Sequence, residues 1–471
     1  MVFSSNIFLL FFLPVFFLCY FITPVRYRNY PLLLFSIIFY SYGAPDFVLI
    51  LLLATVLNFY IVKAMLKATT EKKKKLFCAL SVVVSLSLLL YYKYANFFVE
   101  NINAFLHVCN HSSISWRPVL LPIGISFFTF QSITYTIDMY RATAKPNEKL
   151  TDYVLYIIMF PQLIAGPIVR YNTVAEELVS RKYVTTQQLA GAYRFIIGLS
   201  KKVLISNTLA KIADEAFTMN VSELSTPTAW IGMLAYTLQI YFDFSGYSDM
   251  AIGLGRIMGF HFPENFDNPY TSKSISEFWR RWHITLGAFM REYLYIPLGG
   301  NRVSKRRTYL NLWIVFLLSG FWHGASYNFI LWGAFHGFFL VLDRLFMLDF
   351  LKRIGKIPAV ILTFFVVNLG WVLFRADGLS NALGFYQALF HFSGALQISL
   401  DGESICTLIV ALILSFITLA KFGEKMCNTL YAEVYTTKQS VMLFIFIVLL
   451  LVLSVGSLSV SDFNPFIYFR F

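Results

Sequence analysis

The sequence predicts an all-helical protein that crosses a membrane many times. Hydrophobic residues occupy 58% of the 471 positions and aromatic residues 18%, while only 13% are charged, about half of the share in a soluble domain. Long apolar runs recur along the chain, and in lipid a helix satisfies its own backbone polar groups. A soluble enzyme, a disordered chain and a disulfide-rich secreted domain are thereby excluded. A transmembrane β-barrel is excluded because its strands alternate apolar and polar residues.

The charge balance is basic, with 38 Lys and Arg against 25 Asp and Glu, a net charge of +13. Basic residues of membrane proteins collect in cytoplasmic loops, so we attribute the excess first to topology and second to an anionic ligand on the cytoplasmic side. Nucleic acid is not an expected partner. The five cysteines show no metal or redox spacing, and we expect neither disulfides nor a metal site.

The first part of the chain predicts spans separated by charged loops. Residues 2–23 form an apolar run without a preceding basic residue, which favours a retained span over a signal peptide. Two spans, one of them short, are expected before the basic loop at 63–75. Spans at 76–99 and 118–140 follow, joined by an outer loop at 101–117.

The remaining apolar runs complete one membrane domain. Residues 153–169 are broken by Pro161 and by Gly166 and Pro167, which indicates a kinked or re-entrant element. Further spans are expected at 229–254, 309–322, 329–347, 357–374, 405–420 and 441–460. The chain therefore predicts roughly a dozen transmembrane or re-entrant helices. We expect a single membrane-embedded domain over residues 1–471, with residues 462–471 as a short outward-facing tail.

An ionisable residue inside an apolar run is costly and therefore a candidate for function. The motif GFWHGA at 320–325 places His323 fourteen residues beyond a basic loop. At the helical rise this is on the order of 20 Å from the cytoplasmic surface. The alternative is a core histidine that bonds a neighbouring helix. His336 follows thirteen residues later and is compatible with either role.

A second motif, EFWRRWH at 277–283, combines acidic, aromatic and basic residues. On a helix, Glu277 and Arg281 would pair at a spacing of four, and His283 would neighbour Arg280. One interpretation is an interfacial amphipathic helix with an aromatic anchor. The other is a tunnel wall that binds an anion and places His283 at its inner end.

Two carboxylates, Asp243 and Asp249, interrupt the apolar run at 229–254. We expect them to hold Arg or His side chains of neighbouring helices, and so to orient groups rather than to react. The chain has no G-x-S-x-G elbow, P-loop, G-x-G-x-x-G or H-E-x-x-H motif. Hydrolase, ATPase and metalloprotease functions therefore lack support.

Four segments together carry a family resemblance: PQLIAGP at 161–167, YFDFSGYSD at 241–249, the stretch 278–300, and GFWHGASYNFILWGAFHG at 320–337. The chain resembles the membrane-bound O-acyltransferases, in the bacterial branch of alginate and peptidoglycan O-acetyltransferases. The resemblance covers nearly the whole chain. It implies the fold of that family, with helices around a central tunnel, in the bacterial inner membrane.

The resemblance also implies roles for individual residues. His323 matches the catalytic histidine of the family and His283 the second histidine of its tunnel. The implied donor is a cytoplasmic thioester, acetyl-CoA or an acylated carrier, with no tightly bound cofactor. The segment FIYFRF at 466–471 resembles the end of a relay peptide in the related D-alanylation system. There a tyrosine takes the acyl group, which makes Tyr468 the candidate acyl relay.

A mechanism can be written from the chemistry. Transfer from a thioester to a hydroxyl needs a base and a group that stabilises the oxyanion, and imidazole titrates near neutrality. We expect His323 to deprotonate the acceptor and His283 to position the thioester or the oxyanion. The candidates to bind donor phosphates are Arg280, Arg281, Arg302, Lys305, Arg306 and Arg307. The candidates to orient these groups are Asp243, Asp249, Trp279, Trp282 and His336.

The predicted function is O-acetylation of a cell-wall polysaccharide. Peptidoglycan is favoured because the high Phe and Lys usage is typical of an AT-rich bacterial genome; alginate or another exopolysaccharide is the alternative. Besides membrane lipids, a periplasmic polysaccharide O-acetyltransferase of the Ser-His-Asp type is the expected partner, since this chain lacks such a motif. The rivals from other classes are a proton-coupled multispan transporter, with Asp243, Asp249 and His323 as a proton relay, and a structural scaffold.

Overall fold

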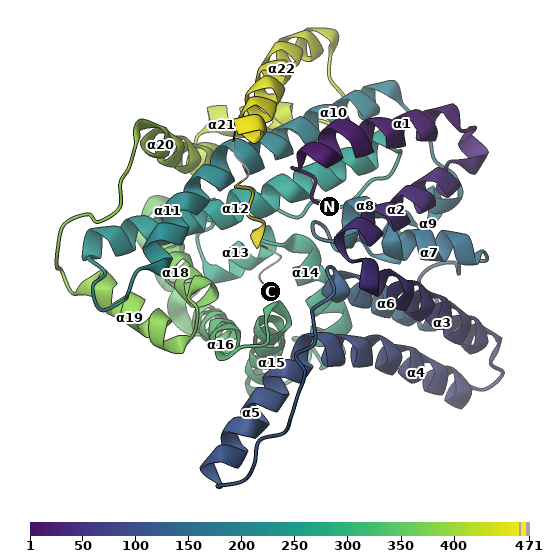
Figure 1. Ribbon diagram of the computed structural model, residues 1–471, viewed down its shortest axis with the longest axis horizontal. Coiled ribbons are helices and arrows are strands. Elements are labelled where there is room, and N and C mark those ends of the chain that lie inside the picture. The colour runs from purple at the N-terminus through teal and green to yellow at the C-terminus, as the bar shows by residue number, and fades with distance from the viewer. Residues whose placement is uncertain (461–462, 468–471) are drawn as a thin grey trace. The chain divides into compact units, whose positions relative to one another are not determined.

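The computed structural model describes residues 1–460 and 463–467. Within those ranges the chain is built from helices and loops, without a β-strand (Figure 1). The predicted fold class is therefore confirmed. The helices group into two compact units, residues 1–184 with 258–263, and residues 185–257 with 264–471.

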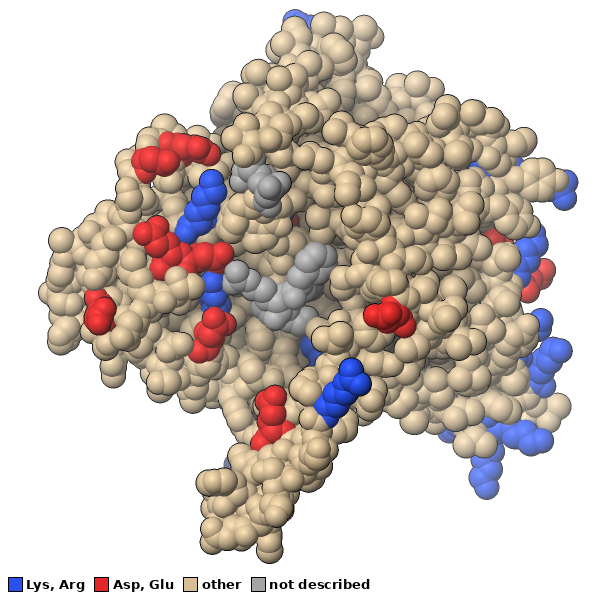
Figure 2. Space-filling model, in the orientation of Figure 1, with Lys and Arg blue, Asp and Glu red and all other residues tan. Residues whose placement is uncertain are grey.

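Several helices are long and apolar enough to cross a membrane. The six that qualify among the described residues are Pro45–Lys67, Glu71–Val108, Tyr327–Ile354, Lys356–Arg375, Gly402–Leu419 and Thr437–Val460. A shorter apolar helix covers Phe8–Ile22. Large hydrophobic side chains on these helices are exposed, such as Phe11, Leu53 and Ile445, and Figure 2 shows a face with few charged side chains. This surface suits lipid, as expected of a multi-pass membrane protein.

The first unit packs around one phenylalanine. Phe160, on the short helix α8, lies 5.1 Å from Phe16, 5.4 Å from Phe12 and 5.5 Å from Phe39 between ring centroids. The predicted break near Pro161 is present, because α7 ends at Ile158 and α8 begins after it. The helices of this unit are α1 (Leu13–Ile22), α2 (Asn29–Gly43), α3 (Val48–Lys67), α4 (Glu71–Leu89), α5 (Ala95–Val108), α6 (Ile125–Tyr140), α7 (Leu150–Ile158), α8 (Phe160–Leu163) and α9 (Tyr171–Val179).

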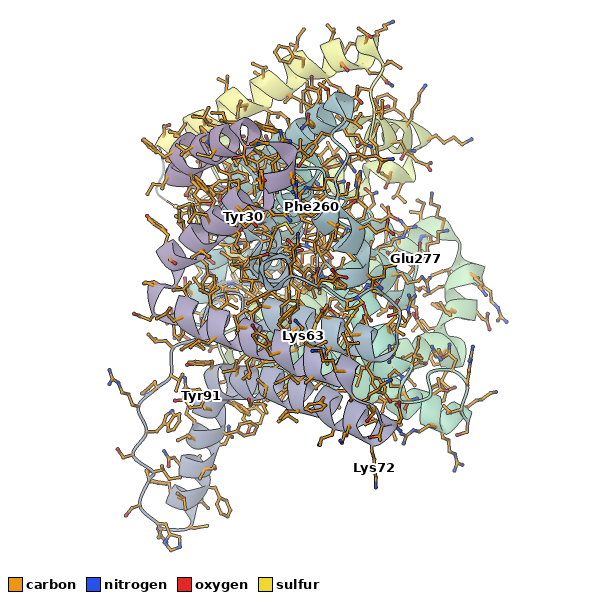
Figure 3. The ribbon with its side chains drawn as sticks, turned by 90° about the vertical axis from the view of Figure 1, so that its right-hand side faces the viewer. Tyr30, Lys63, Lys72, Tyr91, Phe260 and Glu277 are labelled. Carbon is orange, nitrogen blue, oxygen red and sulfur yellow. The ribbon has the colours of Figure 1, made fainter. Side chains whose placement is uncertain are left out.

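Two predicted loops of this unit are shorter than expected. The basic stretch at 63–75 is mostly helical, since Lys63 lies on α3 and Lys72 on the first turn of α4 (Figure 3). Lysine is a good helix former, and Thr70 caps α4 by accepting from the Lys73 N–H. The outer loop expected from residue 101 begins later, because α5 continues to Val108.

The second unit contains the residues of both histidine motifs. Its helices are α10 (Thr185–Ser200), α11 (Asn207–Thr218), α12 (Thr226–Ile257), α13 (Ile275–Arg281), α14 (Ile284–Phe289), α15 (Lys305–His323), α16 (Tyr327–Leu342), α17 (Leu348–Ile354), α18 (Lys356–Arg375), α19 (Leu379–Phe390), α20 (Gly402–Phe416), α21 (Lys421–Leu430) and α22 (Thr437–Val460). Two π-helical turns, η5 (Lys201–Ser206) and η7 (Met290–Tyr295), continue α10 and α14. Helix α12 packs against α10, α11 and α18.

Two glycine pairs bring α10 and α12 into backbone contact. A Cβ placed on Gly198 would lie 2.5 Å from the carbonyl oxygen of Gly246, and one on Gly191 would lie 2.7 Å from that of Gly253. Small residues at a helix crossing permit such an approach. This contact places the cations at the end of α10 and just after it beside the two carboxylates of α12. The cations are Arg194, Lys201 and Lys202, and the carboxylates are Asp243 and Asp249.

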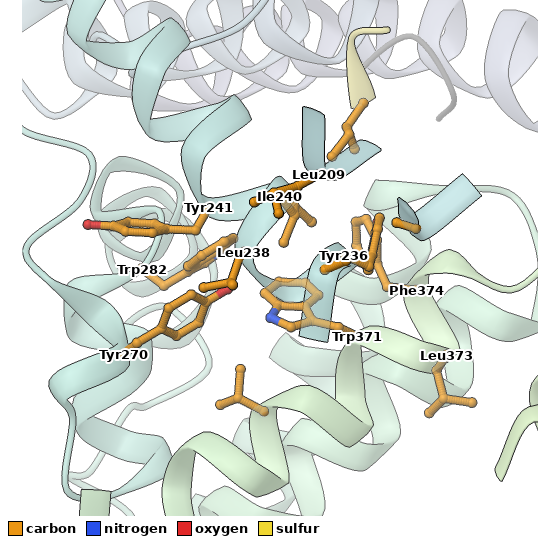
Figure 4. Packing of buried hydrophobic residues seen from close by; sticks show 14 of the residues in the cluster. Leu209, Tyr236, Leu238, Ile240, Tyr241, Tyr270, Trp282, Trp371, Leu373 and Phe374 are labelled. Atoms are coloured by element: carbon orange, nitrogen blue, oxygen red, sulfur yellow. The ribbon is translucent and has the colours of Figure 1, made fainter. Parts of the chain in front are cut away.

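The core of this unit is aromatic. Trp282 stands 4.8 Å from Trp371 and 6.0 Å from Tyr270 between ring centroids, and Trp371 stands 5.4 Å from Phe374. Figure 4 shows these rings together with Tyr241 of α12. Burying rings of this size is a major source of packing energy, and the cluster surrounds the histidines described next.

Candidate active site

His323 is the last residue of α15, at the opposite end from the basic residues that begin that helix. Its side chain is buried, and its imidazole meets Trp332 at 5.0 Å and Phe374 at 5.2 Å, both edge to face. The glycines of the motif serve helix packing, because a Cβ on Gly320 would lie 3.0 Å from the Cα of Gly333 on α16. The glycines therefore allow the backbones of α15 and α16 to approach each other closely.

His283 lies between α13 and α14 in a left-handed conformation, with φ of 46°. This corrects the predicted continuous helix over 277–283: α13 ends at Arg281, so His283 does not continue the helical register of Arg280. A left-handed backbone at a residue other than glycine persists only when its surroundings hold it. Here the Ile284 N–H donates to the backbone oxygen of Asn265 at 2.9 Å.

The imidazole of His283 is also held by Asn265. Its Nδ1 lies 3.0 Å from Asn265 Oδ1, which accepts from Thr285 Oγ1 at 2.9 Å, while Asn265 Nδ2 donates to Ser248 Oγ at 3.1 Å. Since an amide oxygen can only accept, Nδ1 carries the proton. His283 lies outside the six candidate spans, and burial lowers its pKa to about 3, so the ring is neutral at physiological pH.

Trp322 lies beside both predicted histidines. Its ring centroid is 4.9 Å from that of His323 and 6.4 Å from that of His283. A small cavity of about 10 Å³ adjoins His323, roughly the volume needed for one water. Its lining consists of Ile240, Phe244, Trp282, His323, Trp332, Trp371, Phe374 and Ile467. Phe244 also meets the imidazole of His283 edge-on at 4.7 Å.

His336 is fully buried on α16 among tryptophans. Its ring meets Trp279 at 4.9 Å and Trp332 at 5.0 Å, and neither ring nitrogen has a hydrogen-bond partner among the residues that the structure describes. A Cβ on Gly370 would lie 2.8 Å from His336 Nε2, so α18 covers the ring. Trp332 therefore lies against both His336 and His323.

Asp249 is buried and belongs to a network of charges that extends to Glu264, whose side chain is exposed. It pairs with Arg194 at 2.8 Å and with Lys201 at 2.7 Å, and Arg194 also pairs with Glu264 at 2.5 Å. Glu264 directly precedes Asn265, the partner of His283. The network thus ties α10 and α12 to the loop that holds His283. Sequence reasoning did not identify this role of Arg194, although a cation in an apolar stretch was the available signal.

Asp243 pairs with Lys202 at 2.6 Å, with both side chains almost completely buried. The pair also binds the backbone of the segment 463–467. The Ile467 N–H donates to Asp243 Oδ2 at 3.0 Å, and Lys202 Nζ donates to the carbonyl oxygen of Pro465. The proposed relay residue, Tyr468, lies outside the described residues.

The predicted donor-binding residues are largely on the surface. Arg281 forms the predicted ion pair with Glu277 at 2.8 Å and reaches Thr271 Oγ1 at 3.3 Å. The others are exposed on α13, before α15 or on its first turn: Arg280, Arg302, Lys305, Arg306 and Arg307. None of the six lines the cavity that lies beside α12.

That cavity has a volume of about 440 Å³ and lies beside α12. The polar groups of its wall include those of Arg194, Lys201, Ser245, Ser248 and Asn265. It therefore reaches the amide that holds His283. Sequence reasoning did not identify Asn265, which lies in no motif.

The chain was also compared with known proteins. The sequence model of the membrane-bound O-acyltransferase family matches residues 33–367. A probable alginate O-acetylase of Pseudomonas aeruginosa is 44% identical over 437 residues, covering 91% of this chain and 84% of the relative. That of Pseudomonas putida is 42% identical over 495 residues, covering 100% of both chains. A peptidoglycan O-acetyltransferase of Helicobacter pylori is 38% identical over 443 residues, covering 87% and 82%.

The matched stretch includes α12, both histidine motifs, three of the six candidate spans and part of a fourth. It also accounts for the resemblance expected from the four sequence segments. This multi-pass membrane protein is an acyltransferase and belongs to the membrane-bound O-acyltransferase family.

Proposed function

We propose that this protein moves acetyl groups from a cytoplasmic thioester across the membrane for O-acetylation of an extracytoplasmic polysaccharide. The observation that supports this most directly is the position of His323, buried at the far end of α15 from the basic turn and packed against the same tryptophan as His283. A base is thereby available at a buried position among aromatic side chains.

In the proposed reaction His323 is the base. It takes the proton of the acceptor hydroxyl as the hydroxyl oxygen attacks the thioester carbonyl carbon. The carbon–oxygen bond forms, the carbon–sulfur bond breaks, and the proton passes from His323 to the departing thiolate. With Nδ1–H donated to Asn265, Nε2 of neutral His283 is an acceptor. It suits a hydrogen bond from an amide N–H of the donor and not the stabilisation of an oxyanion.

The donor is proposed to be acetyl-CoA or an acylated carrier, used as a substrate. Its phosphates would meet the exposed basic residues of α13 and α15, such as Arg280 and Arg306. The cavity of about 440 Å³ has room for a flexible arm, and its wall includes Asn265. An arm in this cavity would approach the imidazole of His283.

Tyr468 is proposed as the first acceptor. It follows Ile467, whose side chain lines the cavity beside His323. A phenol has a pKa near 10, so acetyl-tyrosine is a more activated ester than a sugar acetate. A periplasmic polysaccharide O-acetyltransferase of the Ser-His-Asp type would then take the acetyl group, since this chain lacks the motif of such an enzyme.

An alginate-like exopolysaccharide is our first candidate for the final acceptor. The two relatives named as probable alginate O-acetylases share 44% and 42% identity with this chain, against 38% for the relative named as a peptidoglycan O-acetyltransferase. Peptidoglycan, favoured by composition, is the second candidate. Acetate analysis of both polymers from cells with and without the gene distinguishes them.

The function is tested with purified protein in nanodiscs and acetyl-CoA labelled in its acetyl group. We expect thioester turnover and label on the protein, and a loss of at least about a hundredfold in His323→Ala. His261→Ala is the matched control, because that histidine is exposed and pairs with Glu177. In Tyr468→Phe the protein label should disappear. Turnover at the wild-type rate in His323→Ala would overturn the assignment of the base, and gradient-driven flux without thioester cleavage would favour the transporter.

A further inference from the structure

We propose that the buried Asp243–Lys202 ion pair is a docking site for the backbone of the segment 463–467, and that it positions the following residue at His323. The docking is independent of the acyl chemistry. Only its consequence, the presentation of Tyr468 to the base, rests on the proposed function.

The first argument is electrostatic. Both side chains are buried, at 1% exposure for Asp243 and 2% for Lys202, and a buried ion pair is favourable only when its remaining hydrogen-bonding capacity is satisfied. Ser206 Oγ supplies one long bond to Asp243 at 3.4 Å. The segment supplies a backbone N–H to the carboxylate and a backbone carbonyl to the ammonium.

The second argument is that the ion pair bonds to backbone groups of the segment. The carbonyl of Pro465 and the N–H of Ile467 flank one residue, Phe466, and meet the two opposite charges of the pair. Recognition of an extended peptide through its main chain fixes its register, while pockets for its side chains add specificity. The register decides which residue comes next to the cavity beside His323.

The third argument is the side-chain packing of the segment. Phe466 and Ile467 are both buried, and the ring of Phe466 lies 4.8 Å from that of Tyr247 on α12. Asn207 Nδ2 approaches Asn464 Oδ1 at 3.4 Å. Ile467 shares the cavity wall with His323.

The neighbouring carboxylate provides a contrast. Asp249, on the same helix, is satisfied by Arg194, Lys201 and the hydroxyl of Tyr431. Its partners all lie on or beside α10 and α21. Replacing Asp249 therefore perturbs a buried charge network of similar kind without touching the bonds to residues 463–467.

The docking is tested by photocross-linking in the full-length protein. Phe466→p-azidophenylalanine places the probe against Tyr247, so the expected product joins residue 466 to the α12 peptide that contains Tyr247, identified by mass spectrometry. In Asp243→Asn the yield of this product should fall about tenfold, the loss expected for a charge-assisted hydrogen bond. In the matched control Asp249→Asn it should persist.

A second variant separates docking from folding. Asp243→Asn combined with Lys202→Met removes both charges together, which avoids an uncompensated buried charge. Size-exclusion chromatography shows whether this double variant is folded. If it is folded and the yield of its cross-linked product falls about tenfold, the ion pair positions the segment. A cross-link at the wild-type yield in the folded double variant would overturn the proposal.

The same experiments distinguish a failure of the proposed Tyr468 relay from a failure of the proposed docking. A cross-link that depends on Asp243, with protein label that persists in Tyr468→Phe, would leave the docking intact and exclude the relay. If the acetyl label on the protein is lost in Tyr468→Phe but the cross-link persists in the ion-pair variants, the docking proposal is excluded and the relay is retained.

Discussion

Nδ1 of His283 lies 3.0 Å from Oδ1 of Asn265, and this bond determines which nitrogen of the imidazole faces away from its support. The same amide oxygen accepts from Thr285, and the Asn265 backbone bonds the residue after His283. A side chain in a left-handed turn is thus fixed in both position and tautomer by one residue. Partners that orient an imidazole in this way tune its chemistry without touching the substrate.

Asn265→Ala should lower kcat by about ten- to a hundredfold. The substitution removes the acceptor for His283 Nδ1 and releases the tautomer, while the backbone bond to Ile284 can remain. Steady-state turnover of labelled acetyl-CoA measures the effect. Asn381→Ala, an exposed site on α19, is the control and should be neutral. A kcat of Asn265→Ala within about twofold of wild type would exclude the orienting role.

The stability of the protein should fall as the pH drops from 7 towards 5. Burial lowers the pKa of His283 to about 3, below its ordinary value of about 6.5 in the unfolded chain. Between these values the unfolded state binds more protons, so acid favours unfolding. Thermal unfolding in nanodiscs at several pH values should show a shallower slope for His283→Gln than for wild type. Parallel slopes would contradict the assigned burial.

Much of the fold could be predicted from local patterns, because each membrane-spanning helix is a single continuous apolar run in the sequence. The expected spans at 357–374 and 441–460 correspond to α18 and α22 within a few residues. The sequence placed His323 one helix length beyond a basic loop, and the structure has His323 as the last residue of α15, which begins with basic residues. Asp243 and Asp249 stood out as charges in an apolar run, and the structure gives each of them cationic partners.

The parts that sequence reasoning missed depend on contacts between distant segments. The turn at His283 is held by Asn265, 18 residues earlier. No residue type in the motif predicts a left-handed backbone at this position. The bond between Asp243 and Ile467 joins residues 224 positions apart. A pattern along the chain carries no information about which loop returns to which helix, so these contacts had to be observed.

Gly198→Ala should destabilise the protein by about 1–3 kcal/mol and reduce turnover. The added Cβ would lie 2.5 Å from the Gly246 carbonyl oxygen, which is backbone and cannot swing away. The helices α10 and α12 must separate, and the ion pairs of Arg194, Lys201 and Lys202 lengthen. Thermal unfolding measures the change. Gly456→Ala is the control, because nothing lies within 4 Å of a Cβ there; equal effects at both sites would contradict the close crossing.

Trp332→Phe should lower kcat more than it changes the KM for the donor. The indole packs against the rings of His323 and His336, each at 5.0 Å, and a smaller ring leaves His323 less constrained. Misplacing a base by a fraction of an ångström costs on the order of tenfold in rate. Trp116→Phe, at a partly exposed site in the first unit, should leave both constants unchanged. A rise in KM with unchanged kcat would place Trp332 in donor binding.

Ser245→Leu should raise the KM for the thioester donor while leaving the protein folded. Ser245 lines the cavity of about 440 Å³, and its hydroxyl has no hydrogen-bond partner among the described residues. The larger side chain would fill space proposed for the donor arm and would therefore weaken binding of the donor. Ser245→Ala, which keeps the cavity open, is the matched control and should bind the donor as wild type does. If Ser245→Leu is folded and retains the wild-type KM, the arm does not enter this cavity, and the donor must reach His323 from another side.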